Sequence, residues 1–186
     1  MRTAIVWGSS TGQTEQAAGR LHELLNGVSD LCVDVNDFSA DDILGCDVVI
    51  IGVSTWDIGE IQCDWEDRII EMEDHDWSST HVAFFGTGDG LTYDDTFVDA
   101  FGLIWERIVP KGAKLLGKWP TEGYSFADSA SLTDDRSHFL GLPLDNDNEP
   151  QLTDARLVSW AEKLRGEIAA LTADEQPAAA APPPAE

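Results

Sequence analysis

The segment from Asp47 to Val53, Asp-Val-Val-Ile-Ile-Gly-Val, is an almost uninterrupted apolar run. A strand of this composition has no polar side to turn toward water, which is typical of parallel sheets covered on both faces. Further apolar runs at 3–7, 31–35 and 81–86 alternate with helical patterns at 14–25, 64–72, 96–109 and 153–171. This alternation predicts an α/β fold with helices on both sides of a parallel sheet.

The interval from Gly117 to Pro150 interrupts the alternation. It is rich in Gly, Ser, Asp and aromatic residues and is too long for an ordinary connection. We therefore expect an insertion with its own hairpin. Beyond residue 172 the chain is dominated by Ala and Pro, a composition that does not build a core. The expected organisation is one domain over 1–172 and a disordered tail over 173–186.

The loop from Gly8 to Glu15, Gly-Ser-Ser-Thr-Gly-Gln-Thr-Glu, connects the first expected strand to the first expected helix. Backbone N–H groups at a helix N-terminus bind phosphate, and glycine and small hydroxyl residues let the chain close around the oxygens. The loop has no Lys or Arg, so neutral donors alone would hold a phosphate there.

The alternative reading of this loop is a capping box, with Thr11 or Thr14 as the N-cap and Glu15 in the first turn. A Walker loop is excluded because the Gly-Lys-Ser/Thr ending is missing. A dinucleotide fingerprint is excluded because Gly12 stands where three spaced glycines are needed.

In open parallel sheets, ligands bind beyond the carboxyl ends of the strands, where the strand order reverses. The loops 54–60 and 87–94, after the third and fourth expected strands, should therefore meet the phosphate loop. Each carries one aromatic residue, Trp56 and Tyr93. Either could anchor its own loop, but two of them beside a phosphate site indicate a flat ring held between aromatic faces. Flavin mononucleotide (FMN) fits this ligand best.

Several segments then resemble the long-chain flavodoxins, in order and with matching spacing over about residues 2–171. They are the loop 8–15, Thr-Trp-Asp-Ile-Gly-Glu-Ile-Gln-Cys-Asp-Trp at 55–65, Phe-Gly-Thr-Gly-Asp at 85–89, Trp-Pro-Thr-Glu-Gly-Tyr at 119–124 and Gly-Leu-Pro-Leu-Asp-Asn-Asp-Asn at 141–148. The resemblance implies a flavodoxin-like three-layer sandwich. Its five-stranded parallel sheet would have the order 2-1-3-4-5 known for such sheets, with the long-chain insertion in the last strand.

By this resemblance, the first loop holds the phosphate, and Trp56 and Tyr93 flank the isoalloxazine ring. Gly88 and Asp89 would contact the pyrimidine edge of the ring, and Asp147 would lie near the ribityl chain. The full set of expected FMN-binding residues is Ser9, Ser10, Thr11, Gly12, Gln13, Thr14, Ser54, Thr55, Trp56, Asp57, Ile58, Gly59, Thr87, Gly88, Asp89, Tyr93, Asp94 and Asp147.

The resemblance also marks the Asp57–Ile58 peptide as the one that reorients when the flavin gains a proton at its central-ring nitrogen. The family usually has Asn where Asp57 stands, so this chain places another negative charge beside the ring. Together with an uncompensated phosphate and the carboxylates of Asp89, Asp94 and Asp147, that charge should make the second reduction of the flavin difficult.

The function implied is that of a low-potential one-electron carrier and not an enzyme. Implied partners are a flavodoxin/ferredoxin–NADP reductase and enzymes such as oxoacid oxidoreductases or nitrogenase. One alternative is an FMN-dependent NAD(P)H:quinone reductase on the same fold, and another is a binding domain without redox function. No catalytic acid, base or nucleophile set is evident, and no metal site is expected, since the acidic run at 71–76 lacks the spacing of a calcium loop.

The charge balance excludes some partners. The chain has 35 acidic and 11 basic residues and a formal net charge of −24, so nucleic acid and anionic membranes are poor ligands for it. The surplus is either a solubilising surface or an adaptation to molar salt, and we favour the latter. Three widely spaced cysteines, and no leader or membrane-spanning run, favour a monomer in the reducing cytoplasm.

Overall fold

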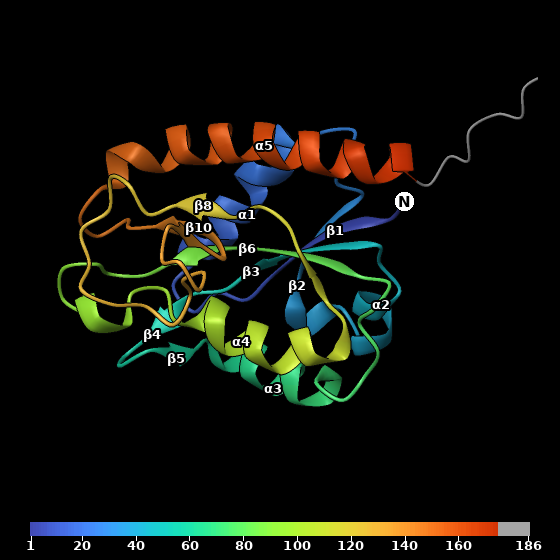
Figure 1. Cartoon of the computed structure of the whole chain (residues 1–186), viewed down its shortest axis with the longest axis horizontal. Coiled ribbons are helices and arrows are strands. Elements are labelled where there is room, and N and C mark those ends of the chain that lie inside the picture. Colours follow the sequence, from blue (N-terminus) through green and yellow to red (C-terminus); the bar gives the residue numbers. More distant parts are fainter. Residues whose placement is uncertain (175–186) are drawn as a thin grey trace, which may run out of the picture.

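The computed structural model describes residues 1–174 of the 186-residue chain, and it places a sheet between two layers of helices (Figure 1). The tail was expected from residue 173, but residues 173 and 174 belong to the last helix, and the rest of the expected tail lies outside the described residues. The strands are β1 (Thr3–Trp7), β2 (Leu31–Asp34), β3 (Val48–Gly52), β4 (Thr55–Trp56), β5 (Glu60–Ile61), β6 (His81–Thr87), β7 (Lys114–Leu115), β8 (Trp119–Pro120), β9 (His138–Phe139) and β10 (Gly141–Leu144). The α-helices are α1 (Gln13–Leu24), α2 (Ala40–Leu44), α3 (Cys63–Met72), α4 (Ala100–Ile108) and α5 (Thr153–Asp174).

The central sheet is parallel and has the order β2-β1-β3-β6-β10. Counted along the chain, these five strands give 2-1-3-4-5, so the expected order is confirmed. The apolar run at 47–53, which predicted a strand buried on both faces, contains β3, whose five residues are all buried. In the register of the sheet, Ile50 of β3 lies between Ile5 of β1 and Ala83 of β6. The strand order reverses between β1 and β3, which is where such sheets bind ligands.

The last strand of the sheet is split into two pieces along the same edge of β6. β7 pairs with the start of β6, where Lys114 lies opposite His81, and β10 pairs with its end, where Leu144 lies opposite Thr87. The sheet therefore has a sixth strand of two residues beyond the five expected. Residues 116–140 lie between the two pieces and form the insertion, in which β8 and β9 pair antiparallel. The insertion was expected over 117–150, but Gly141–Leu144 belong to the parallel sheet as β10.

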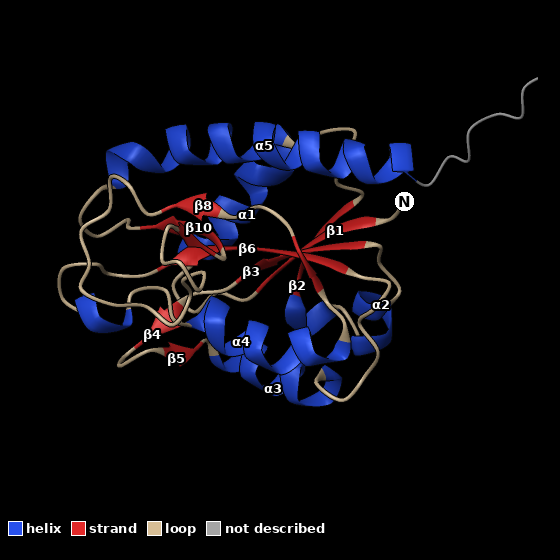
Figure 2. Cartoon of the chain, viewed as in Figure 1, coloured by secondary structure: helices blue, strands red, loops and turns tan. Residues whose placement is uncertain are grey.

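Apolar side chains fill both faces of the sheet, with α1 and α5 on one side and α3 and α4 on the other (Figure 2). β3 serves both layers, because successive side chains of a strand point to opposite faces. Val49 and Ile51 belong to the cluster under α3 and α4, whereas Val48 and Ile50 belong to the cluster under α1 and α5. The helix layers thereby fix the sheet, and with it the loops at its carboxyl edge.

The helix predicted over 96–109 begins later than expected. A 3-10 turn covers Asp94–Thr96, and Val98 has φ +53°, a left-handed conformation that β-branched residues rarely adopt. α4 starts only after it, at Ala100. The hydroxyl of Ser131 donates to the Val98 carbonyl at 2.6 Å and accepts the Gly102 N–H at 2.8 Å. The insertion therefore holds the start of this helix.

No helix within residues 1–174 combines the length and the apolar character that crossing a bilayer requires.

Candidate functional site

A cleft of about 310 Å³ lies at the carboxyl edge of the sheet, where the loops after β1, β3 and β6 meet. Its volume is that of a small-molecule site. The loop after β10 also contributes one residue to its wall. The cleft is lined by Thr11, Gln13, Ser54, Thr55, Trp56, Asp57, Thr87, Gly88, Asp89, Tyr93, Thr96 and Asp147.

The first wall of the cleft is the N-terminus of α1. Gly12 is the N-cap residue, in a left-handed conformation with φ +84°, and no side chain caps the helix. The hydroxyl of Ser9 accepts the Gly12 N–H at 3.0 Å, which closes the loop on itself. The capping box weighed above, with Thr11 or Thr14 as N-cap, is therefore not formed. The first N–H groups of α1 remain available to an anion.

Thr14 is 1 % exposed, and its hydroxyl is buried without a hydrogen-bond partner. An unpaired buried hydroxyl is unfavourable by about 1–3 kcal/mol, so a native structure rarely keeps one without reason. Its place in the first turn of α1 puts it next to the uncapped N–H groups. A phosphate oxygen at the helix N-terminus would accept a hydrogen bond from this hydroxyl and so satisfy it.

The second wall follows β3. The indole N–H of Trp56 donates to the buried Ser54 hydroxyl at 3.0 Å, which orients a half-exposed ring. β4 and β5 then form a tight hairpin whose turn holds Asp57 at φ +43° and Gly59 at φ +89°. Ile58 at the tip is 82 % exposed. A non-glycine residue with positive φ is uncommon and marks a strained turn.

The third wall follows β6. Asp89 accepts hydrogen bonds from the backbone N–H groups of Leu91 at 3.0 Å and Thr92 at 2.8 Å, and its carbonyl accepts the Tyr93 N–H at 3.1 Å. These bonds fold the loop so that Tyr93, which is 43 % exposed, lines the cleft together with Asp89. The side-chain amide of Asn148 adds a further bond to Asp89 at 2.9 Å.

These contacts keep Asp89 ionised. Burial alone would raise the pKa of its carboxyl, but the bonds from the Thr92 side chain and backbone, from Asn148 and from the Leu91 N–H lower that pKa to about 2. Hydrogen bonds to the charged form of a carboxylate act in this direction. Asp89 therefore carries a full negative charge in the wall of the cleft at neutral pH.

The structure brings eleven of the expected residues to one cleft: Thr11, Gln13, Ser54, Thr55, Trp56, Asp57, Thr87, Gly88, Asp89, Tyr93 and Asp147. Seven others lie in the same loops, in the first turn of α1 or on the 3-10 turn, and do not line it: Ser9, Ser10, Gly12, Thr14, Ile58, Gly59 and Asp94. Asp94 is exposed on the 3-10 turn, where its carbonyl accepts the N–H groups of Ala127 and Asp128. Thr96, which also lines the cleft, was not expected from the sequence.

A family model described as Flavodoxin matches residues 5–163 of this chain. Flavodoxin 1 of Salmonella typhimurium is 41% identical over 167 residues, which covers 89% of this chain and 94% of that protein. A flavodoxin of Nostoc sp. is 39% identical over 167 residues and covers 90% and 97% of the two chains. Among solved structures, Fusobacterium nucleatum flavodoxin bound to flavin mononucleotide is similar with a TM-score of 0.82 and 23% identity, over 90% of this chain and 99% of that one.

Proposed function

The chain belongs to the flavodoxin family, and we propose that it is a low-potential carrier of single electrons with non-covalently bound FMN. Proteins of this family are electron carriers and not enzymes. When bound, FMN supplies the one-electron redox chemistry of its ring system. The observation that carries the proposal is the single cleft shared by two exposed aromatic residues, Trp56 and Tyr93, and the uncapped start of α1.

The phosphate end of this site would be held by the loop 9–14. Uncapped N–H groups of α1 and the unpaired Thr14 hydroxyl are neutral donors for a dianion. The residues lining the cleft include no Lys or Arg. The phosphate would therefore be bound without being neutralised. Its negative charge would oppose the addition of negative charge to the ring at the other end of the ligand.

The ring end of the site would be held by Trp56 and Tyr93, with Gly88 and Asp89 at the pyrimidine edge and Asp147 near the ribityl chain. Aromatic faces contribute stacking of about 0.5–1.5 kcal/mol per pair beyond burial. The bond from Trp56 to Ser54 supports this role, because it limits the ring orientations that remain before the ligand binds.

The Asp57–Ile58 peptide would be the one that reorients when the flavin takes up a proton. Two properties of the turn support this role. Asp57 already has a left-handed φ of +43°, and Ile58 is 82 % exposed, so little packing opposes a change of backbone conformation. A carbonyl turned toward the ring would accept a hydrogen bond from the added proton.

The low potential would come from charges that lie close to the ring. Asp57, Asp89 and Asp147 line the cleft, and each carboxylate opposes the addition of negative charge to a bound ring. Asp89 has its pKa lowered to about 2, so its contribution is constant over the physiological pH range. Distant surface carboxylates should contribute little in high salt, where the screening length is about 3 Å at 1 M.

The type of flavodoxin, the bounds of its domain, its environment and its partners are also part of the proposal. The insertion 116–140 supports the long-chain type, and a domain over 1–172 would bind the cofactor. The net charge of −24 supports adaptation to a saline cytoplasm and a monomeric protein. Partners would be a flavodoxin/ferredoxin–NADP reductase and oxoacid oxidoreductase or nitrogenase-type enzymes. They would dock on Ile58 and Leu91, two exposed apolar residues in the loops after β3 and β6, of which Leu91 is 65 % exposed.

The test of the function uses the purified chain reconstituted with FMN. We expect one FMN per chain, no oxidation of NADPH in the presence of a quinone, and rapid transfer of electrons from NADPH to cytochrome c once ferredoxin–NADP reductase is added. Oxidation of NADPH by the chain and quinone alone would instead identify a reductase. Failure to retain FMN would overturn the proposal.

A further inference from the structure

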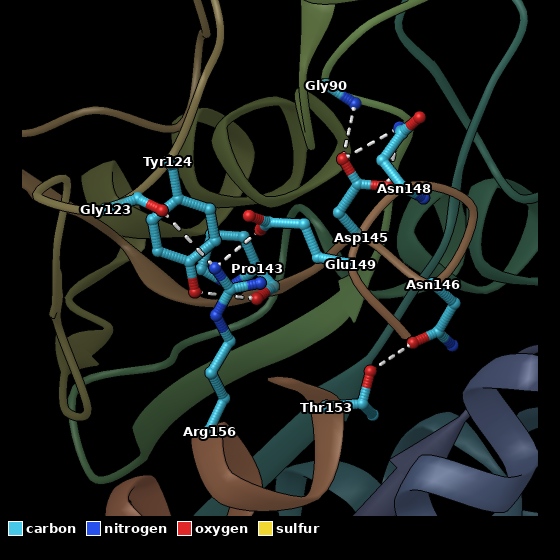
Figure 3. Close-up of polar contacts among 10 residues, drawn as sticks. All are labelled: Gly90, Gly123, Tyr124, Pro143, Asp145, Asn146, Asn148, Glu149, Thr153 and Arg156. Carbon is cyan, nitrogen blue, oxygen red and sulfur yellow. Dashed lines mark hydrogen bonds and ion pairs between the residues drawn. The ribbon is translucent and has the colours of Figure 1, made fainter. Parts of the chain in front are cut away.

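The side-chain amide of Asn148 connects two acidic loops behind the wall of the cleft. Its nitrogen lies 2.9 Å from Oδ1 of Asp89, in the loop after β6, and 2.9 Å from Oδ1 of Asp145, directly after β10. Oδ2 of Asp145 lies 3.0 Å from the same nitrogen (Figure 3). Only the NH₂ end of an amide can face two carboxylates, since its oxygen has no hydrogen to donate. Asn148 is therefore a double donor between two negative charges.

A second bond crosses between the two loops in the opposite direction. The Gly90 N–H, next to Asp89 in the chain, donates to Oδ2 of Asp145 at 3.1 Å (Figure 3). Asp145 is 5 % exposed, and its carboxylate also accepts the Asn148 backbone N–H at 3.1 Å, so these donors satisfy a buried polar group. Without the Asn148 side chain, the two carboxylates would still repel each other. The hydrogen bond between Asn148 and Asp89, which joins the two loops, would be lost.

The loop that carries Asn148 is itself fixed to α5. The hydroxyl of Thr153 donates to the Asn146 side-chain oxygen at 2.5 Å, and the guanidinium of Arg156 donates to Glu149 at 2.7 Å (Figure 3). Arg156 also lies 4.0 Å from the ring centre of Tyr124 in the insertion. The loop 145–149 is thus anchored at its far end. The loop 88–93, which is exposed from Leu91 to Tyr93, is the one that Asn148 holds in place.

We propose that Asn148 is a positioning residue for the cofactor site, which fixes the loop 88–93 against the anchored loop 145–149 by bridging Asp89 and Asp145. This inference rests on the proposed FMN site. Asn148 does not line the cleft, but Asp89 and Tyr93 of the loop that it holds do. Because Asn148 is neutral, it joins the two carboxylates without cancelling their charge, which a lysine at this position would do.

The test measures the dissociation constants of FMN and riboflavin from the apoprotein by quenching of flavin fluorescence. Asn148→Ala should weaken both ligands by about tenfold, because a hydrogen bond to charged groups is lost from a loop that contacts the ring. The two ligands should be affected equally, since they differ only in the phosphate, which the proposed site places at the loop 9–14, whereas the Asn148 side chain bonds to Asp89 and Asp145. Asn148→Gln retains the amide donor and should recover most of the affinity.

The control is Asn36→Ala. Asn36 is exposed in the turn after β2 and does not line the cleft, so its loss should change both constants by less than about threefold. In an Asp89→Ala background, Asn148→Ala should likewise have less than about a threefold effect, because the bridged charge is gone.

Three outcomes would overturn the inference: Asn148→Ala binding flavins as the unchanged protein does, an equal loss in Asn36→Ala, or a full loss that persists in the Asp89→Ala background. If Asn148→Ala does not fold, Asn148→Asp takes its place, because it keeps the size of the side chain but has no N–H to donate. Asn148→Asp should weaken both flavins, and unchanged binding in that variant would overturn the inference. Failure of the unchanged protein to bind FMN would instead refute the flavin function itself.

Discussion

The indole N–H of Trp56 lies 3.0 Å from the hydroxyl of Ser54, two residues earlier in the same loop. Ser54 is 6 % exposed at the end of β3, whereas Trp56 is 36 % exposed at the cleft. The bond therefore ties a surface ring to the buried edge of the sheet. A ring held in this way loses less conformational freedom when a ligand stacks on it.

Ser54→Ala removes that tie and should weaken FMN binding. One neutral hydrogen bond contributes about 0.5–1.5 kcal/mol, so we expect a two- to tenfold larger dissociation constant. Quenching of flavin fluorescence during titration of the apoprotein measures it. Ser78→Ala, at an exposed serine that does not line the cleft, is the control. Equal constants for Ser54→Ala and the unchanged protein would show that the bond does not orient the ring.

Thr14→Val should separate phosphate binding from ring binding. Valine keeps the shape but removes the unpaired hydroxyl, so the apoprotein should be at least as stable as before. FMN should bind more than about tenfold more weakly, because a hydrogen bond to a charged phosphate is lost, while riboflavin affinity stays unchanged.

Thr3→Val provides the matched control. Thr3 in β1 also has a buried hydroxyl without a partner, but it lies at the start of that strand, away from the N-terminus of α1. This variant should leave both affinities unchanged. A Thr14→Val protein that binds FMN normally would contradict the assignment of the phosphate site.

Asp57→Asn should raise the lower of the two flavin potentials. A like charge about 8 Å away, at an effective dielectric of about 20, opposes reduction by about 2 kcal/mol. That corresponds to about 90 mV for one electron, so a rise of tens of millivolts is expected. A redox titration in 0.1 M salt, where the screening length is about 10 Å, measures it. Asp41→Asn, in α2 away from the cleft (Figure 1), should have no effect. An unchanged potential in Asp57→Asn would refute the local-charge explanation.

The lowered pKa of Asp89 predicts a pH-dependent contribution to stability. A carboxyl whose pKa falls from 3.8 to about 2 on folding stabilises the native state above the unfolded-state value. That contribution disappears as the pH drops through about 2. Urea unfolding should therefore show Asp89→Asn to be less stable than the unchanged protein at pH 6, with the difference shrinking between about pH 4 and 2. A difference that stays constant with pH would contradict it.

The parallel sheet was predictable from the sequence because β3 must be buried on both faces. Its strand order came from the family resemblance, since apolar runs do not state which strands are neighbours. α2 was not predicted: it has only five residues, Ala40–Leu44, and its Ser39 N-cap is a weak signal alone. The late start of α4 depends on the left-handed Val98, whose conformation is held by Ser131 from the distant insertion.

The position of Trp56 and Tyr93 at one cleft was predictable, because each lies in a loop that follows a predicted strand. Asn148 was missed because its role depends on Asp89, 59 residues away in the sequence. Thr96 was missed because the segment was read as helix, whereas a 3-10 turn brings it to the cleft. Contacts of this kind come from the tertiary arrangement and leave no periodic pattern.

The most direct test of a low-potential flavin carrier is a spectroelectrochemical titration of the FMN-reconstituted protein. We predict one FMN per chain and two separated one-electron steps, the second of them well below that of free FMN. A chain that binds no FMN, or whose two steps coincide with those of free FMN, would contradict the proposed function.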